Sequence, residues 1–348
     1  MSSIITGYHT CGPGPFPTPD PFLFCVFHND QFPPGNERME APRRGNGADF
    51  NPKAAYRMYH GEKVPGFPQH PHRGFETITA TITGTIDHSD SCGNAGRYGG
   101  GDLQWMTAGK GVVHGEMFPL IEKEKDNPCK FFQIWINLPA RSKMVDPSFK
   151  MHWAEHVPHV RSASGETDVT VWAGSVGGVA ALAPPPNSWA SDPANEVAVL
   201  LIKVAPGSKY TLPPAAHGTE IARALYWVEG DALTVGGEKV TRATPIRIDV
   251  RADASASISV PMAARGEALV LVLQGRPIGE PVAQHGPFVM NTQSEIAQAF
   301  ADYRATRFGG WPWPSDAMVF PREKKRFSLL DGVETTPPLA PADAASEL

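Results

Sequence analysis

Short apolar stretches separated by glycines dominate the middle of this chain. The stretch "ETITATIT" over 76–83 alternates strictly, with Ile78, Ala80 and Ile82 at even positions and threonines at odd ones, and Gly84 follows it. A period of two is typical of a β-strand. Further strand-like runs cover 102–108, 111–118 and 129–139. Strands joined by glycine turns at this spacing favour a barrel or a double sheet.

A second strand-rich block, from about 168 to 275, has the same shape as the first. "RALYWVEGDALTVGG" and "TATITGTIDHSDSCG" both contain a strand, a glycine turn (Gly230 and Gly84) and a return strand. This weak internal repeat predicts two copies of one β-barrel unit. The 34 glycines and 35 prolines among 348 residues fit many turns and short strands. We therefore predict an all-β dominated fold with two β-barrel domains.

One helix is expected, near the end of the chain. "TQSEIAQAFADYRATRFGG" begins with Thr292, and Glu295 three residues later completes a capping box. An apolar stripe that includes Ile296 and Phe300 predicts that the helix packs back onto a barrel. The predicted organisation is a segment joining the barrels over 1–36, a polar loop over 37–64, an N-terminal barrel over 65–160, a C-terminal barrel over 165–285, the helix over 286–310 and a disordered tail over 328–348.

Composition excludes several classes of protein. The net charge of −5 and the lack of a basic stripe argue against direct nucleic-acid binding. The four cysteines form no CxxC pair, which indicates a reduced, intracellular protein. The N-terminal stretch has neither a basic start nor a long apolar run, so we expect no secretory signal and no membrane span.

Two histidine-containing pairs stand out in the strand-rich region. His70 and His72 flank Pro71, which favours an extended backbone, and His114 and Glu116 are also two residues apart. Residues two apart in a strand point to one face, so both pairs can project into one cavity. One His-x-His pair in a β-protein is usually a surface feature, whereas two pairs in glycine-punctuated strands favour a metal site. Three imidazoles and a carboxylate without sulfur suit Fe, Mn, Ni, Cu or Zn better than Ca or Mg.

The sequence offers two candidates for the carboxylate ligand of this site. If 70–83 is one regular strand, the side chain of Glu76 lies on the same face as those of His70 and His72. Ile78 and Ala80 also lie on this face, which would make it the apolar interior face. Parity alone does not choose between Glu76 and Glu116. The C-terminal block has no His-x-His pair, and its His217 has only Glu220 nearby in sequence, so we expect no metal there.

Several motifs, in order, resemble the pirin family of cupin proteins. "PGFPQHPHRGFETITATITGTIDHSDSCGNAG" and "GDLQWMTAGKGVVHGEM" resemble the two pirin metal motifs, and "DPFLF", "FQIWINLPARSKM" and "QHGPFVMNTQSEIAQAFADYR" are similar to further family segments. The resemblance covers about 20–310 and makes 37–64 look like an enlarged loop. It implies a bicupin, with double-stranded β-helix barrels and one metal in the N-terminal barrel.

The resemblance also implies the ligands and the metal. Carried over residue by residue, the ligands are His70, His72, His114 and Glu116, which favours Glu116 over Glu76. The metal implied is iron, as Fe(II), one per chain, with Mn, Ni, Co, Cu or Zn as alternatives. The side chains of Arg73, Phe75, Trp105 and Met106 are candidates to line the pocket, or else only fill the barrel.

Two functions are compatible with these ligands. Some pirins resemble quercetinases, which cleave a flavonol with O2 and release carbon monoxide, and Glu116 would then be the catalytic base. Other pirins are similar to nuclear, iron-dependent transcription co-regulators, in which the metal senses redox state and a protein partner replaces the substrate. We expect the enzyme, as a monomer in the cytoplasm, with the co-regulator and a nuclear location as the alternative.

Overall fold

The computed structural model describes residues 3–12, 14–44 and 48–338. The chain divides into two compact units, and each is considered by itself below. Unit 1 comprises Met1–Val26, Ile134–Asn137 and Val157–Gly279, and unit 2 comprises Phe27–Gln133, Leu138–His156 and Glu280–Leu348. Within the described residues, no helix has the length and hydropathy needed to cross a membrane.

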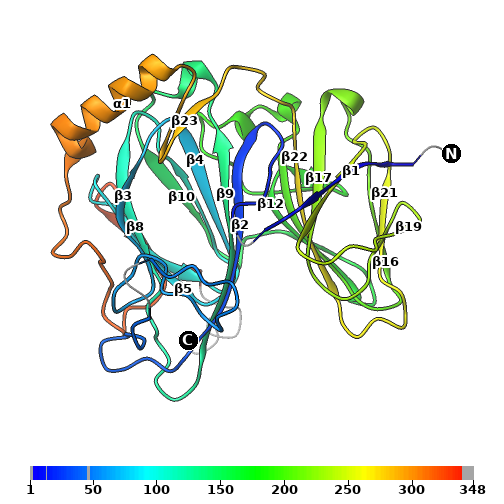
Figure 1. The fold of residues 1–348 in the computed structure, drawn as a ribbon, viewed down its shortest axis with the longest axis horizontal. Coiled ribbons are helices and arrows are strands. Elements are labelled where there is room, and N and C mark those ends of the chain that lie inside the picture. The colour runs from blue at the N-terminus through cyan, green and yellow to red at the C-terminus, as the bar shows by residue number, and fades with distance from the viewer. Residues whose placement is uncertain (1–2, 13, 45–47, 339–348) are drawn as a thin grey trace, which may run out of the picture. The chain divides into compact units, whose positions relative to one another are not determined.

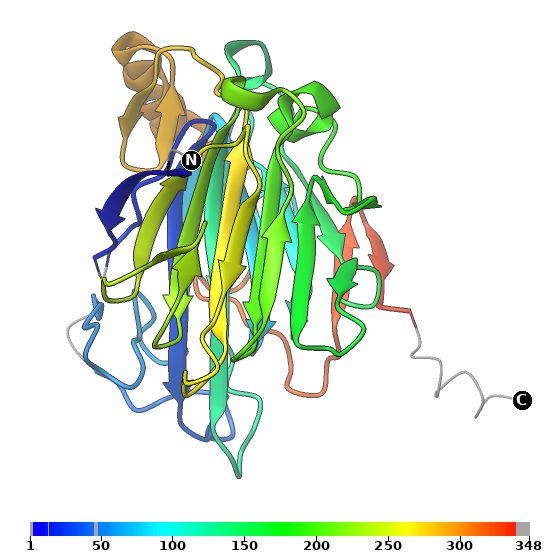
Figure 2. The same cartoon turned by 90° about the vertical axis from the view of Figure 1, so that its right-hand side faces the viewer.

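Unit 1 is built from a large sheet of order β1-β20-β17-β22-β15-β12-β11 and a small one of order β16-β21-β18-β19, with a β13–β14 hairpin. Figure 2 shows strands of the large sheet side by side. Apolar side chains from both sheets, such as Leu200, Val270 and Ile258, meet in one core. The strands are β1 (Ile5–Thr10), β11 (His159–Arg161), β12 (Thr167–Ala173), β13 (Ser175–Val176), β14 (Val179–Ala180), β15 (Ala198–Val204), β16 (Lys209–Leu212), β17 (Ala222–Glu229), β18 (Thr234–Val235), β19 (Glu238–Lys239), β20 (Ile246–Val250), β21 (Ala256–Ser259) and β22 (Ala268–Gly275).

Unit 2 has two sheets of order β10-β7-β4-β9-β2 and β26-β25-β6-β5-β8-β3, and a β23–β24 hairpin. Phe131 from the first sheet and Tyr98 and Ile86 from the second share an aromatic-rich core. The strands are β2 (Phe22–Phe32), β3 (Gly66–His72), β4 (Phe75–Thr83), β5 (Thr85–Asp90), β6 (Ala95–Gly99), β7 (Leu103–Thr107), β8 (Val112–Met117), β9 (Asn127–Asn137), β10 (Ser148–His152), β23 (Ala283–His285), β24 (Phe288–Met290), β25 (Phe327–Leu330) and β26 (Val333–Thr335).

The α-helix α1 (Gln293–Thr306) confirms the predicted C-terminal helix, including the reciprocal capping box of Thr292 and Glu295. Its apolar stripe packs on the β23–β24 hairpin, beside which Figure 1 shows it in orange. The helix ends at Thr306, before the predicted limit at residue 310, because Arg307 adopts the left-handed conformation. Short 3-10 helices are η1 (Ala140–Ser142), η2 (Trp189–Ser191), η3 (Pro193–Asn195), η4 (Gly218–Glu220) and η5 (Arg307–Gly309).

The chain leaves one sheet for the other between β3 and β4. Gly74 has φ +87°, and a Cβ there would lie 1.9 Å from the Val289 carbonyl oxygen, so only glycine fits this turn. β3 belongs to the six-stranded sheet and β4 to the five-stranded one. Residues 70–83 are therefore not the one regular strand considered from the sequence, and the parity of His72 does not extend to Glu76.

A hairpin of β25 and β26 lies where the sequence analysis predicts a disordered tail. β25 pairs with β6, and the buried Arg97 of β6 donates to the backbone carbonyls of Phe320, Pro321 and Lys324. These bonds attach the segment to unit 2. The predicted disorder is therefore wrong for 328–338. Residues 339–348 lie outside the described part of the chain.

Candidate metal centre

Three histidines converge between the two sheets of unit 2. His70 and His72 lie on β3 and His114 on the neighbouring antiparallel strand β8, where it pairs directly with His70. Ligand nitrogens of the three side chains all lie within 4.8 Å of one another. The ring centroids are 4.5 Å apart for His70 and His114 and 4.9 Å apart for His72 and His114. Adjacent strands thus form a compact nitrogen triad.

The triad is held in the form that binds metals. His72 is 3% exposed and His114 is 1% exposed, whereas His70 is partly exposed and gives the triad one accessible edge. Burial, helped by the neighbouring imidazoles, lowers the pKa of His72 and His114 well below the ordinary histidine value, and burial also lowers the pKa of His70. Neutral imidazoles near pH 7 are the ligating species.

Hydrogen bonds to two of the rings, and their absence at the third, fit a bound cation. His70 Nδ1 lies 2.9 Å from the Pro68 carbonyl oxygen, and His72 Nδ1 lies 3.4 Å from that of Pro287. A donating Nδ1–H places the lone pair on Nε2, as metal-binding histidines require. Neither ring nitrogen of His114 has a hydrogen-bond partner among the described residues. Because such burial is costly, a metal ligand role accounts for it.

The two candidate glutamates lie on different faces. Glu116 shares the inner face of β8 with His114, and its carboxylate accepts from Thr79 Oγ1 at 2.8 Å, Tyr98 OH at 3.2 Å and Gln133 Nε2 at 2.7 Å. Its charge also acts on His70. Thr79 therefore points from β4 into the same cavity, and Glu76, of opposite parity on that strand, points to the other face.

The carboxylate of Glu76 has its own hydrogen-bond donors on that other face. Its carboxylate accepts from Trp105 Nε1 at 3.1 Å and from Thr107 Oγ1 at 2.6 Å. Because β4 and β7 pair in register, Trp105 and Thr107 share this face with Glu76. The geometry thus favours Glu116 as the carboxylate of the triad.

The predicted lining residues separate into two groups. Phe75 is buried with its ring 5.0 Å from that of His72, and Met106, opposite Thr77 in the register, lies on the inner face. Trp105 lies on the opposite face, and Arg73 is directed to the C-terminal helix, where it pairs with Asp302 at 2.7 Å. The structure therefore places Phe75 and Met106, but not Trp105 and Arg73, on the side of the triad.

Sequence reasoning missed a fourth buried histidine beside the triad. His88 on β5 pairs with Glu116 on β8, and Asp90 pairs with His114, so all four side chains share one sheet face. The His88 ring is 5.5 Å from that of His114, and its Nε2 is 3.6 Å from Asp90 Oδ2. The signal was available: "HSD", after the Gly84 turn, repeats the spacing of two.

Other features of the described chain lie outside this centre. A cavity of about 420 Å³ in unit 2 is lined by residues that include Phe32, Gly84 and Leu120, and none of the three histidines lines it. In unit 1, His217 pairs with Glu196, and Glu220 pairs with Arg276. Within the ranges that the structure describes, the triad is the group suited to hold a metal.

Two units of paired sheets, with a histidine triad in one of them, define a protein of two cupin domains, a bicupin. The pirin family model matches residues 21–136, and the model of the pirin C-terminal cupin domain matches 199–309. Human pirin is 34% identical over 262 residues, which cover 75% of this chain and 84% of that protein. The chain belongs to the pirin family.

Two further relatives extend the comparison. A pirin-like protein of Caulobacter vibrioides is 36% identical over 257 residues, which cover 70% of this chain and 80% of that protein. Among solved structures, a quercetin 2,3-dioxygenase from Acinetobacter baumannii has a TM-score of 0.67 and 27% sequence identity, covering 88% of this chain and 96% of that one. The bicupin fold predicted from sequence is thereby confirmed.

Proposed function

We propose that this protein is a mononuclear non-haem iron enzyme of the quercetin 2,3-dioxygenase type, which cleaves a flavonol-like substrate with dioxygen. The observation that carries the proposal is the convergence of His70, His72 and His114, with Glu116 on the same face and one histidine edge accessible. The likeness to a bicupin named as a quercetin 2,3-dioxygenase supports the same chemistry.

The ligand set proposed is His70, His72, His114 and Glu116, holding one Fe(II) per chain. Nitrogen and carboxylate donors without sulfur also suit Mn, Ni, Co, Cu and Zn, so the donor set restricts the metal without selecting one. When bound, the iron supplies a redox-active Lewis acid.

Glu116 is the proposed base. A flavonol loses the proton of its 3-hydroxyl on binding, and a carboxylate beside that oxygen can accept it. Thr79, Tyr98 and Gln133 all donate to the carboxylate of Glu116, which fixes its orientation. Burial raises the pKa of Tyr98 well above its ordinary value, so its hydroxyl stays a donor across the neutral range.

The remaining residues shape the site. The rings of Phe75 and Phe149 border His72 and His88 respectively, and both phenylalanines are buried. Their apolar surface keeps water from the inner side of the imidazoles, which strengthens electrostatic interactions there. Access is left at His70, the one partly exposed member of the triad. This edge favours an enzyme over a redox-sensing co-regulator, because a sensor without turnover needs no substrate access.

Turnover is the test. Protein loaded with one iron per chain is given quercetin, oxygen consumption is followed, and carbon monoxide is measured in the headspace. We expect turnover that falls at least about 100-fold in His72→Ala, because a ligand to the metal is lost. The absence of oxygen consumption by the loaded wild type would contradict the enzyme and favour the co-regulator.

A further inference from the structure

Three aromatic rings gather at the accessible edge of the triad. Phe67 lies on β3 three residues before His70, and their ring centroids are 6.4 Å apart. His60 lies 5.7 Å from Phe67 with the rings at 70°, and Phe50 lies 5.0 Å from His60, also at 70°. The three rings therefore form a continuous series of edge-to-face contacts, and Phe67 at its end lies beside the tilted ring of His70, a proposed metal ligand.

This aromatic cluster is open to solvent. Phe50 is 48% exposed, although it is a large apolar side chain, and His60 is also exposed, while Phe67 is partly buried. An exposed apolar ring is unremarkable alone, but one in contact with further rings at the edge of a site suggests a ligand surface.

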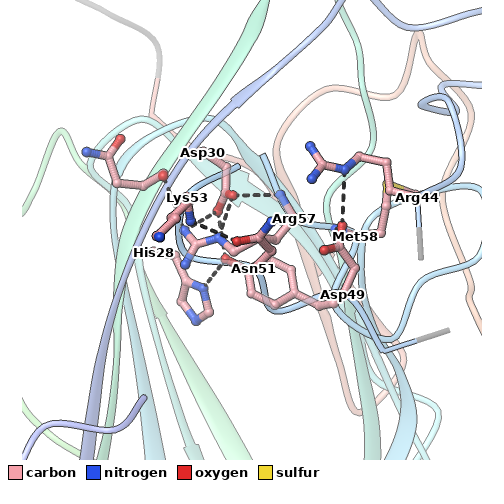
Figure 3. Close-up of polar contacts among 10 residues, drawn as sticks. His28, Asp30, Arg44, Asp49, Asn51, Lys53, Arg57 and Met58 are labelled. Atoms are coloured by element: carbon pink, nitrogen blue, oxygen red, sulfur yellow. Dashed lines mark hydrogen bonds and ion pairs between the residues drawn. The ribbon is translucent and has the colours of Figure 1, made fainter. Parts of the chain in front are cut away.

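Phe50 and His60 come from the enlarged polar loop, which is attached firmly to unit 2. The side chain of Arg57 donates to both carboxylate oxygens of Asp30 at 2.9 and 3.0 Å, and its backbone N–H donates to Asp30 as well. Tyr59 OH donates to Asp30 at 2.7 Å and lies 2.7 Å from His28 Nδ1. Figure 3 shows Asp30, Arg57 and His28 in this network.

A second attachment holds the two ring-bearing parts of the loop together. The backbones of Asp49 and Tyr59 exchange both hydrogen bonds, at 2.9 and 3.0 Å, and the Asp49 carboxylate accepts from the Met58 N–H at 3.0 Å. Phe50 and His60 each follow one member of this pair. Their positions are thus fixed by backbone and buried polar bonds, as a preorganised binding surface requires.

We propose that Phe50, His60 and Phe67 form an aromatic ledge that binds the flat ring system of the substrate beside His70 and so determines specificity. The proposal rests on the function proposed above and adds to it the residues that hold the rings of the substrate. The ligand is a planar, polycyclic aromatic chelator, bound by ring contacts at one end and by the triad at the other. Rings meeting edge to face present both positive edges and negative faces to such a ligand.

The test separates ring binding from chelation and from turnover. Protein loaded with Zn(II), which is not redox-active, is titrated without oxygen with quercetin, and separately with acetohydroxamate, a small chelator without rings. The variants are Phe50→Ala and His60→Ala. Met262→Ala, which removes a 79% exposed apolar side chain in unit 1, is the matched control.

We expect each ledge variant to raise the Kd for quercetin about tenfold, with the Kd for acetohydroxamate and one zinc per chain unchanged, and Met262→Ala to behave as the wild type. A Kd for quercetin within twofold of the wild type in both ledge variants would overturn the ledge, as would failure of the loaded wild type to bind quercetin. Selective loss of quercetin binding without any iron-dependent turnover would leave the ledge standing and refute the dioxygenase.

Discussion

Two buried glutamates of unit 2, Glu76 on β4 and Glu116 on β8, show how the face from which a side chain projects gives similar residues different roles. Glu76 and Glu116 both have carboxylates that accept from neutral donors, and each follows a histidine of the triad closely in sequence, Glu76 after His72 and Glu116 after His114. They differ in the sheet face from which they project, and the position of Thr79 shows which face is the inner one. The ligand role we propose for Glu116 therefore depends on the register of β4 as much as on β8.

Exchange of each glutamate for glutamine tests this assignment. We expect Glu116→Gln to weaken iron binding about 100-fold, since an anionic oxygen donor is lost, and Glu76→Gln to keep one iron per chain. Metal content after dialysis measures both, with circular dichroism as the check on folding. Full iron content in Glu116→Gln, or loss of iron from a folded Glu76→Gln, would contradict the assignment.

At the scale of elements, a buried lysine joins three pieces of chain around the ligand strand. Lys143, directly after η1, is 1% exposed, and its Nζ donates to the Gly74 carbonyl at 2.8 Å and to the Val289 carbonyl of β24 at 3.2 Å. It therefore holds the β3–β4 turn, two residues after His72, against the C-terminal hairpin. Burial lowers the pKa of Lys143 to about 8, although the charges of Glu280 and Glu295 oppose the shift.

This lowered pKa gives a pH dependence of stability with a definite sign. The unfolded chain keeps the proton of Lys143 up to the ordinary value of 10.5, whereas the folded protein releases it from about pH 8. The unfolded state thus binds more protons, and the free energy of unfolding should rise by roughly 1.5 kcal/mol between pH 8 and 9.5. Urea unfolding of metal-free protein measures this rise.

The matched variants are Lys143→Met and Lys63→Met, of which the second removes an exposed lysine. We expect the rise to disappear in Lys143→Met and to persist in Lys63→Met. The same slope with pH in Lys143→Met and the wild type would show that another group is responsible.

Some elements could be predicted from local sequence and others could not. The capping box of Thr292 and Glu295 and the alternation of β4 act within a few residues, so both predictions were confirmed. The break at Gly74 depends on the approach of Val289 from more than 200 residues away, and the β25–β26 hairpin depends on contacts with Arg97. The site follows the same rule: the spacing of "HSD" was a signal in the sequence, but the β5–β8 register is what places His88 on the sheet face of His114 and Glu116.

At the scale of the whole molecule, two units of like architecture differ in their chemistry. Unit 2 carries the triad, whereas each described histidine of unit 1 is paired with a carboxylate: His9 with Asp249, His159 with Asp168 and His217 with Glu196. A cupin unit without a metal can remain as a scaffold, since its core of apolar side chains needs no ligand.

We predict one metal per chain, bound by unit 2. Elemental analysis after loading with excess iron and gel filtration should give one equivalent for the wild type and less than about a tenth for His114→Ala, because a missing ligand weakens binding strongly. His217→Ala is the control and should keep one equivalent. Two equivalents in the wild type, or loss of metal in His217→Ala, would show a second site in unit 1.

The buried imidazole of His114, whose nitrogens have no hydrogen-bond partner among the described residues, sets the stability of the metal-free fold against metal binding. A buried ring whose nitrogens lack partners among the described residues costs the metal-free fold about 1–3 kcal/mol. Replacing it with leucine would remove that cost, so the metal-free fold would become more stable while the triad would lose one of its three nitrogen ligands. The histidine at this position therefore lowers the stability of the metal-free fold, and the proposed metal accounts for its presence.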